Sequence, residues 1–333
     1  MTLPAVLNQV GLIAIGRNEG ERLKRCLASV KNQLAHIVYV DSGSTDGSVE
    51  LVQSLGVEVV SLDLSVPFTA ARARNTGFRR LLEINPSIQF VQFVDGDCEV
   101  VEGWLAVAHQ ALMEHESWAV VCGRRREKFP HQSVYNLLCD LEWDTPIGEA
   151  GSCGGDFLIR VDAFKQINGF NPGLIAGEEP EMCVRLRQQG WRIWRLDHEM
   201  TLHDAQMTNF GQWWKRAKRT GHAFAEGSSL HGSSEQRHWV RETRSLWFWG
   251  VVVPTAALAS ASLTHGLGLV LLLAYPLMVV RISARHCSKM QLKPALLYAL
   301  SCVIGKFAQA SGAIQFLWNR LSGKRSSLIE YKA

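Results

Sequence analysis

Between Gly11 and Leu202 the sequence alternates short apolar runs, rich in Val and Ile, with stretches of helical character. This alternation is typical of an α/β domain with a mostly parallel sheet, because each crossover between parallel strands needs a helix-sized connection. The expected strands are Val10–Ile15, His36–Val40, Val57–Ser61 and Phe90–Val94, and Glu21–Asn32 is the expected helix after the first. The sequence therefore predicts such a sheet with flanking helices.

Polar residues stand where three of these predicted strands end. Arg17-Asn18-Glu19 follows the first, Asp41 begins a small, acidic turn after the second, and Asp95 follows Phe90–Val94. In an open α/β sheet, ligands bind outside the carboxyl ends of the strands. We expect these clusters to meet in one crevice.

The triplet Asp95-Gly96-Asp97 offers two carboxylates at a strand end. Hard oxygen ligands of this kind bind Mg²⁺ or Mn²⁺, which bridge the phosphates of a ligand. Acidic turns after strands are common, so the triplet alone predicts little. His203, after the probable strand Arg192–Leu196, could complete the metal shell, since histidine suits Mn²⁺ better than Mg²⁺. A structural or surface role is the alternative for this histidine.

Composition limits the class of protein. The 333 residues are 47% hydrophobic, enough for a large core, and the net charge of +4 gives no reason to expect a nucleic-acid partner. The eight cysteines form no C-x-x-C pair, which favours reduced thiols in the cytoplasm. Met1–Gln9 shows no secretory signal, so we expect the catalytic part to remain in the cytoplasm.

The composition changes sharply after about Leu246. Leu246–Leu263 contains no charged residue, and a second uncharged run, Leu267–Val280, follows. We expect a hairpin of two membrane helices at about 246–263 and 266–282, the second being short for a span. Trp247 near the start favours a membrane interface. The alternative is a hydrophobic helical hairpin buried in a soluble core.

Basic residues flank the predicted hairpin on both sides: Arg237, Arg241 and Arg244 before it, and Arg281, Arg285, Lys289 and Lys293 after it. The positive-inside tendency then makes both flanks cytoplasmic, which predicts an inner or cytoplasmic membrane protein whose catalytic domain faces the cytoplasm. A third apolar stretch, about 294–318, carries Lys306 and Gln309 on one helix face. It is expected to be an interfacial amphipathic helix or a third span. The expected domains are 1–235, catalytic, and 236–333, membrane-associated.

Several motifs in this order resemble family 2 glycosyltransferases, which have the GT-A fold. The resemblance covers roughly residues 10–225 and rests on Arg17-Asn18-Glu19, Asp41–Gly47, Ala73–Gly77, Asp95-Gly96-Asp97, Gly154–Arg160, Gly169-Phe170, Gly177–Glu181 and Arg185-Leu186. It implies a mixed, mostly parallel sheet and an inverting transferase that moves a sugar from a UDP- or GDP-linked donor to an acceptor.

The resemblance also implies site residues. It places the nucleotide sugar at Ala14, Ile15, Arg17, Glu19, Asp41, Ser42, Arg74, Asp95 and Gly96. In these terms Asp41 contacts the base, Glu19 the base or ribose, and Arg74 approaches the diphosphate. Asp97, with His203, would hold the Mg²⁺ or Mn²⁺, with Asp95 on the ribose or beside the metal.

The catalytic base is implied to lie in an acidic pair. The family usually reads Glu-Asp where this chain has Glu178-Glu179, and Glu179 is the expected base, with Glu178 or Glu181 as alternatives. The other interpretation is that these are exposed acids at a helix N-terminus, where they complement the macrodipole. The acceptor side is expected at Gly155, Asp156 and Trp214.

The segment Gln212–Arg216 does not match the Gln-x-x-Arg-Trp motif of processive synthases, so we expect single additions. It could also form a basic amphipathic helix on anionic headgroups. Membrane attachment suggests a lipid-linked or glycan acceptor in cell-envelope or exopolysaccharide biosynthesis. The sequence leaves the donor, the acceptor and the oligomeric state open.

Three other classes of protein fit the sequence less well. A sugar-nucleotide pyrophosphorylase would need a Gly-rich basic loop where Ile13–Glu19 stands, and a dehydrogenase would need G-x-G-x-x-G there. A non-catalytic membrane scaffold or transporter explains the hairpin but not the acidic clusters.

Overall fold

The computed structural model describes residues 7–288, 290–324 and 326–331. The chain divides into two compact units. The first contains the chain up to Phe129 together with Glu142–Ala205, and the second contains Pro130–Leu141 and the chain from Gln206 onward. This division differs from the expected boundary at 235/236, because the helix after residue 209 packs with the C-terminal helices.

One sheet organises the first unit. Within the described residues its order is β3-β2-β1-β4-β8-β6-β9-β5, with β7 beside β9. The strands are β1 (Val10–Gly16), β2 (Ile37–Asp41), β3 (Glu58–Ser61), β4 (Phe90–Asp95), β5 (Cys98–Val100), β6 (Trp118–Glu127), β7 (Gly148–Glu149), β8 (Phe157–Arg160) and β9 (Arg192–His203). β1 to β4 pair in parallel, whereas β8 is antiparallel to β4 and β6. The predicted mixed, mostly parallel sheet is confirmed.

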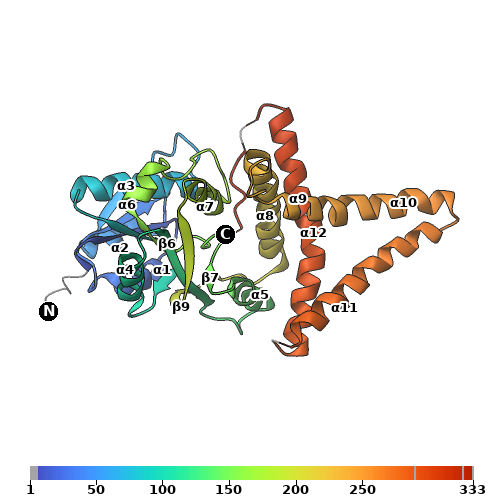
Figure 1. Ribbon diagram of the computed structural model, residues 1–333, viewed down its shortest axis with the longest axis horizontal. Helices are drawn as coiled ribbons and strands as arrows, with labels where there is room; N and C mark the ends of the chain where they lie inside the picture. Colours follow the sequence, from blue (N-terminus) through green and yellow to red (C-terminus); the bar gives the residue numbers. More distant parts are fainter. Residues whose placement is uncertain (1–6, 289, 325, 332–333) are drawn as a thin grey trace. The chain divides into compact units, whose positions relative to one another are not determined.

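Helices lie on both faces of this sheet (Figure 1). They are α1 (Glu21–Val30), α2 (Ser48–Ser54), α3 (Ala70–Ile84), α4 (Trp104–Glu114), α6 (Val161–Gln166) and α7 (Glu178–Gln188), while α5 (Val134–Trp143) is shared between the units. A Cβ atom on Gly77 of α3 would lie 2.5 Å from Ile13 and 2.9 Å from Val40. The missing side chain thus lets α3 approach β1 and β2 closely.

The second unit is helical. It contains α8 (Phe210–His231), α9 (Val240–Trp247), η2 (Phe248–Val252), α10 (Val253–Leu263), η3 (Leu267–Leu273), α11 (Ala274–His286) and α12 (Leu292–Leu321). A Cβ atom on Gly221 of α8 would lie 1.9 Å from the Gln309 carbonyl oxygen, and one on Gly312 of α12 would lie 1.9 Å from that of Lys218. Two glycines therefore allow α8 and α12 to cross in backbone contact, which explains why α8 joins this unit.

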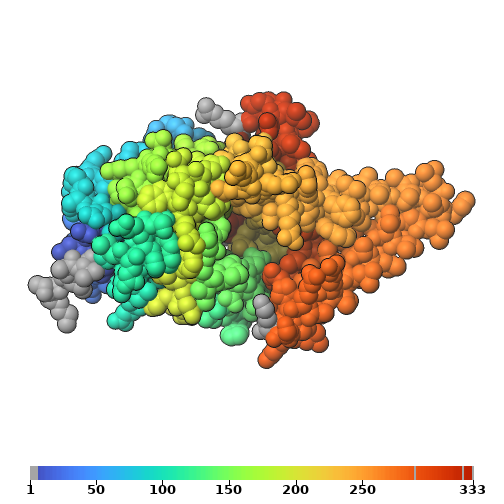
Figure 2. All heavy atoms as spheres, in the orientation of Figure 1, coloured from blue at the N-terminus to red at the C-terminus, as the bar shows by residue number. Residues whose placement is uncertain are grey.

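Three helices of the described chain are long and apolar enough to cross a membrane: Val240–Leu263, Leu267–His286 and Leu292–Leu321. Only 11% and 6% of the most apolar windows of the first two are buried. The alternative of a hairpin buried in a soluble core is therefore wrong, because these apolar side chains face outward. α10 and α11 extend together away from α12 (Figure 1), and the space-filling view shows them as a projecting arm (Figure 2). In α12, 39% of the most apolar window is buried.

α8 carries a buried His–Glu pair. His222 is fully buried, and its Nδ1 lies 3.5 Å from Glu226 Oε2. Burial raises the pKa of Glu226 to about 7, and burial together with nearby Lys218 lowers the pKa of His222 to about 4. Both side chains are therefore neutral through much of the range between these values, and the pair is not an ion pair there.

This pair makes a prediction about stability. Glu226 has a raised pKa in the folded protein, so its contribution to the free energy of unfolding falls as pH rises from about 4.5 to 7. His222 has a lowered pKa, so its contribution is present above about 6.5 and is lost as pH falls toward 4. In the wild type, the effects of Glu226 and His222 on the free energy of unfolding therefore change with pH in opposite directions. In Glu226→Gln we expect stability relative to wild type to rise across pH 4.5–7, by at most about 3 kcal/mol. Denaturant unfolding in detergent at several pH values measures this, and a flat difference would contradict it.

Candidate active site

The ends of β1, β2 and β4 lie side by side. Gly16 of β1 pairs with Asp41 of β2, and Ile15 pairs with Asp95 of β4. The polar residues that follow these strands therefore meet at one edge of the sheet, as the sequence predicted. Ile15 is 9% exposed, whereas Ala14 is fully buried, so in this structure Ala14 has no surface with which to line a nucleotide pocket.

Hydrogen bonds join the loops that follow β1 and β2. The Asn18 backbone N–H donates to Ser44 Oγ at 2.9 Å, and Asn18 Oδ1 accepts from the Thr45 N–H at 2.7 Å. Asp41 Oδ2 accepts from the N–H groups of Gly43 and Ser44, each at 2.9 Å. Asp41 thus shapes its own loop.

The other residues predicted to bind the nucleotide lie on these loops. Glu19 pairs with Arg22 at 2.8 Å, and the exposed Arg17 lies 5.0 Å from the centre of the Phe68 ring. Ser42 is buried, and its N–H donates to the Gly16 carbonyl at 3.0 Å. The structure therefore brings this part of the predicted set together at one edge of the sheet.

Arg74 joins two carboxylates at the centre of the site. Arg74 is 2% exposed, and its guanidinium donates to Asp95 Oδ1 at 2.7 Å and to Glu178 Oε1 at 2.6 Å. Burial lowers the pKa of Arg74, but Asp95 and Glu178 outweigh this and raise it above its ordinary value. Arg74, which was expected to approach the diphosphate, thus links the end of β4 to the start of α7.

Asp156 binds the backbone at the same end of β4. Its carboxylate has no exposed surface and accepts from the Asp95 N–H at 3.1 Å, the Thr201 hydroxyl at 2.8 Å and Arg125 at 2.8 Å. Asp156, which was expected on the acceptor side, is fully buried and holds the Asp95 backbone. Arg125 and Thr201 were not predicted as residues of the site.

Two glycines allow close approaches in this region. Gly155 has φ +105°, and a Cβ atom there would lie 3.3 Å from the guanidinium nitrogens of both Arg74 and Arg125. A Cβ atom on Gly96 would lie 3.1 Å from the Ile15 carbonyl oxygen. Gly155 was expected on the acceptor side, and it lies beside the Arg74–Asp95 pair. Trp214, the other residue expected there, lies on α8, where it packs 5.6 Å from Phe210.

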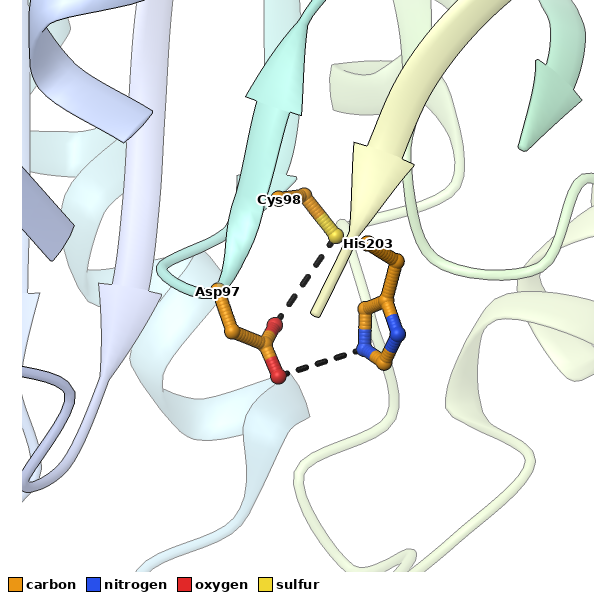
Figure 3. A group of neighbouring side chains, drawn as sticks. All are labelled: Asp97, Cys98 and His203. Atoms are coloured by element: carbon orange, nitrogen blue, oxygen red, sulfur yellow. Dashed lines mark hydrogen bonds and ion pairs between the residues drawn. The ribbon is translucent and has the colours of Figure 1, made fainter. Parts of the chain in front are cut away.

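Asp97 and His203 form the candidate metal site (Figure 3). Asp97 Oδ2 lies 3.2 Å from His203 Nε2, and the Cys98 thiol donates to Asp97 Oδ1 at 3.8 Å. These three side chains are buried, and their ligand atoms lie within 4.8 Å of one another. The antiparallel pairing of Cys98 with His203 between β5 and β9 brings the histidine to the acidic triplet. A carboxylate and an imidazole within reach of one ion fit Mn²⁺.

Glu127 lies behind the histidine and was not predicted. Its Oε2 lies 3.7 Å from His203 Nδ1, and it accepts from the N–H groups of Phe129 at 3.0 Å and Ala205 at 3.2 Å. A carboxylate behind a metal-binding histidine fixes the orientation and tautomer of the ring. Edge contact with Trp143, at a ring distance of 4.8 Å, also restricts it.

The acids at the start of α7 are buried, with exposures of 8%, 2% and 2% for Glu178, Glu179 and Glu181. The interpretation that they are exposed helix-end acids is therefore wrong. Glu178 bonds to Arg74, and Glu181 binds Arg185 through both oxygens.

Glu179 accepts from the N–H groups of Cys153 at 2.7 Å and Gly154 at 2.9 Å, and from the Cys183 thiol at 3.0 Å. Burial raises the pKa of Glu179 although these hydrogen bonds lower it.

Two family models and several known proteins match parts of this chain. Residues 13–166 match the model of glycosyl transferase family 2, and residues 139–209 match that described as the N-terminal domain of galactosyltransferase. A TPR repeat-containing protein of Synechococcus elongatus is 40% identical over 151 residues, which are 44% of this chain and 34% of that protein. The succinoglycan biosynthesis protein ExoA of Rhizobium meliloti is 24% identical over 196 residues, 54% of this chain and 58% of that protein. The chain thus spans less than two thirds of either relative.

A solved structure is similar along nearly the whole chain. It is that of the mannosyltransferase PcManGT from Pyrobaculum calidifontis in complex with GDP-Man and Mn²⁺. The TM-score is 0.64 at 18% identity, and the match covers 96% of this chain and 90% of that one. At this identity the likeness shows a shared fold.

Proposed function

We propose that this chain is an inverting, single-addition transferase of glycosyl transferase family 2, whose model residues 13–166 match. The GT-A fold, which its motifs predicted, supports this proposal. The protein moves a sugar from a UDP- or GDP-linked donor to a lipid-linked or glycan acceptor in cell-envelope or exopolysaccharide biosynthesis. The observation that carries this proposal is the pair Asp97–His203, which lies at the sheet edge beside Asp95 and Arg74.

Asp97 and His203 are the residues that would hold Mn²⁺ or Mg²⁺. A cation bound there would neutralise charge on the diphosphate leaving group. Arg74 supplies a further positive charge next to Asp95, and Gly155 leaves space beside it. The loops of Glu19 and Asp41 would bind the nucleoside, with Arg17 and Ser42 on the same loops.

The proposed base is Glu179, with Glu178 as the alternative. Inverting transfer needs one carboxylate that takes the proton of the acceptor hydroxyl. Burial raises the pKa of Glu179 toward the working range of a general base, which supports it. Glu178 is closer to the donor side, because it is bonded to Arg74.

The donor assay tests the proposal. Detergent-purified protein is incubated with Mn²⁺ or Mg²⁺ and a panel of UDP- and GDP-sugars. We expect one donor to bind and to be consumed, and the product to have the opposite anomeric configuration. If no donor binds or is consumed with either metal, the proposal fails. Formation of a nucleotide sugar from a nucleoside triphosphate and a sugar 1-phosphate would instead indicate the pyrophosphorylase class.

Membrane topology can be measured separately. We propose that Val240–Leu263 and Leu267–His286 cross the membrane as a hairpin, with both flanks in the cytoplasm. Cys287, which is exposed after α11, should react with a membrane-impermeant maleimide in inverted vesicles but not in intact cells. In a Cys287→Ser background, Thr264→Cys at the tip of the hairpin should react in intact cells. The reverse pattern would contradict the cytoplasmic placement of the flanks.

A further inference from the structure

Buried thiols from three separate segments gather around Glu179. Cys122 lies on β6, Cys153 on the loop between β7 and β8, and Cys183 on α7, one helical turn after Glu179. Each thiol residue is at most 9% exposed, and all three are free cysteines. Nothing in the proposed transfer reaction uses them.

The distances within this cluster fit a metal ion. The Cys183 sulfur lies 3.0 Å from Glu179 Oε1, and the ligand atoms of Cys153, Glu179 and Cys183 all lie within 4.8 Å of one another. The thiol of Cys122 interacts with that of Cys153. Cys122 lies outside the set of ligand atoms within 4.8 Å of one another, so its side chain would have to move to become the fourth ligand. Tetrahedral zinc sites have metal–sulfur distances of about 2.3 Å, so their sulfur atoms lie about 3.8 Å apart. Small side-chain movements would bring these groups to that spacing.

The surroundings also match a metal site. Carboxylates that bind metals are usually held by hydrogen bonds of their own. Glu179 accepts from the backbone N–H groups of Cys153 and Gly154 and keeps lone pairs on both oxygens. The four side chains are buried, as are the ligands of sites whose coordination is closed by protein groups.

We propose that these three thiols and the Glu179 carboxylate form a closed binding site for a soft divalent cation of the Zn²⁺ class. Thiolate ligands select Zn²⁺ over Mg²⁺ and Mn²⁺, whereas the carboxylate and imidazole of Asp97 and His203 suit the harder ions. The chain therefore has two cation sites of different chemistry. Binding displaces the thiol protons into solvent, so affinity for the cation rises with pH.

An ion at this site would fasten the loop that carries Gly154 and Gly155 to α7 and β6. Gly155 lies beside Arg74 and Asp95, and the neighbouring Glu178 bonds to Arg74. One consequence for activity rests on the proposed function. If Glu179 is the base, its carboxylate cannot accept the acceptor's proton while it binds Zn²⁺. Zn²⁺ should then inhibit transfer while Mn²⁺ is kept saturating.

Cobalt substitution tests the site. Metal-free protein in detergent is titrated with Co²⁺, whose tetrahedral thiolate complexes give intense visible bands and a near-ultraviolet charge-transfer band. We expect one such site per chain, displaced by Zn²⁺, and at least a tenfold loss of affinity in Cys153→Ser and in Cys183→Ser. Circular dichroism shows whether these variants fold.

Cys98→Ser is the matched control, because Cys98 is buried beside the other candidate site. We expect the thiolate bands to persist in this variant, a result that does not depend on the folding of the Cys153 and Cys183 variants. Loss of the bands in Cys98→Ser, or no thiolate bands in the wild type, would overturn the proposal. Binding without inhibition of transfer would support the site and argue against Glu179 as the base.

Discussion

Asp97→Asn is expected to lower kcat/KM for sugar transfer by about a thousandfold or more. Asparagine keeps the size of the side chain but removes the negative charge that lies 3.2 Å from His203 and is proposed to bind the metal. Loss of a metal that stabilises the leaving group costs several kcal/mol in the transition state, and about 4 kcal/mol corresponds to a thousandfold. Initial rates with saturating Mn²⁺ and the donor identified in the panel measure this effect.

His203→Gln separates metal binding from folding. If the histidine is a ligand, the Mn²⁺ concentration for half-maximal activity should rise roughly 10- to 100-fold, while activity at high Mn²⁺ partly recovers. Asp197→Asn is the matched control, because Asp197 is an exposed carboxylate on the same strand, β9, and should behave like the wild type. Full activity in Asp97→Asn would show that Asp97 is not a required metal ligand. The proposal that the protein is a sugar transferase would not be affected by that result.

The strands β1, β2 and β4 could be predicted because they are buried on both faces of the sheet. Val10–Ile15, His36–Val40 and Phe90–Val94 were each placed within one residue of β1, β2 and β4. A strand covered on both faces reads as a continuous apolar run, and polar residues mark its end. Because a helix connects these strands to one another, they are expected to pair in parallel.

The strands β6 and β8 were harder to predict. The apolar run of β6 is broken by Arg124, Arg125 and Arg126 before the strand ends at Glu127, and β8 has only four residues. These strands also pair with partners distant in sequence, so no local pattern specifies their neighbours. The strand expected at Arg192–Leu196 and its continuation is β9, which ends at His203.

The residues missed in the site follow from the pairing of these strands. The register of β6 with β9 sets Arg125 opposite Thr201 and Glu127 opposite His203, with bulges between the strands. This register decides which side chains support Asp156 and the histidine. A one-residue change would turn every side chain to the other face. The ends of β1, β2 and β4 could be predicted, but this register could not.

Arg74 shows why the acidic pair is hard to assign from sequence. A cation that is 2% exposed needs its partners, and Asp95 and Glu178 both serve this purpose. Glu178 is therefore required for the charge balance around Arg74 whether or not it takes a proton. A large loss of activity in Glu178→Gln would not by itself identify it as the base.

Glu179→Gln is expected to lower kcat by about 10²- to 10⁴-fold, the usual contribution of a general base. The Kd for the donor should stay near that of the wild type, because Glu179 contacts the Cys153–Gly154 loop and not Arg74. In Glu178→Gln, donor binding should weaken together with kcat, because Arg74 loses the carboxylate that positions its guanidinium at 2.6 Å. Glu181→Gln is the matched control: it is buried in the same helical turn but is bonded to Arg185, and it should change kcat little.

The pH profile distinguishes a base from a structural acid at these positions. Burial raises the pKa of Glu179, so the acid limb of kcat/KM in the wild type should lie above the usual range of a glutamate. Activity is lost as pH falls through this pKa, because the protonated carboxyl cannot accept the acceptor's proton. The limb should disappear in Glu179→Gln and remain in Glu181→Gln. If it disappears in Glu178→Gln while Glu179→Gln retains it, Glu178 is the base, and Glu179 serves to hold the loop that carries Gly155.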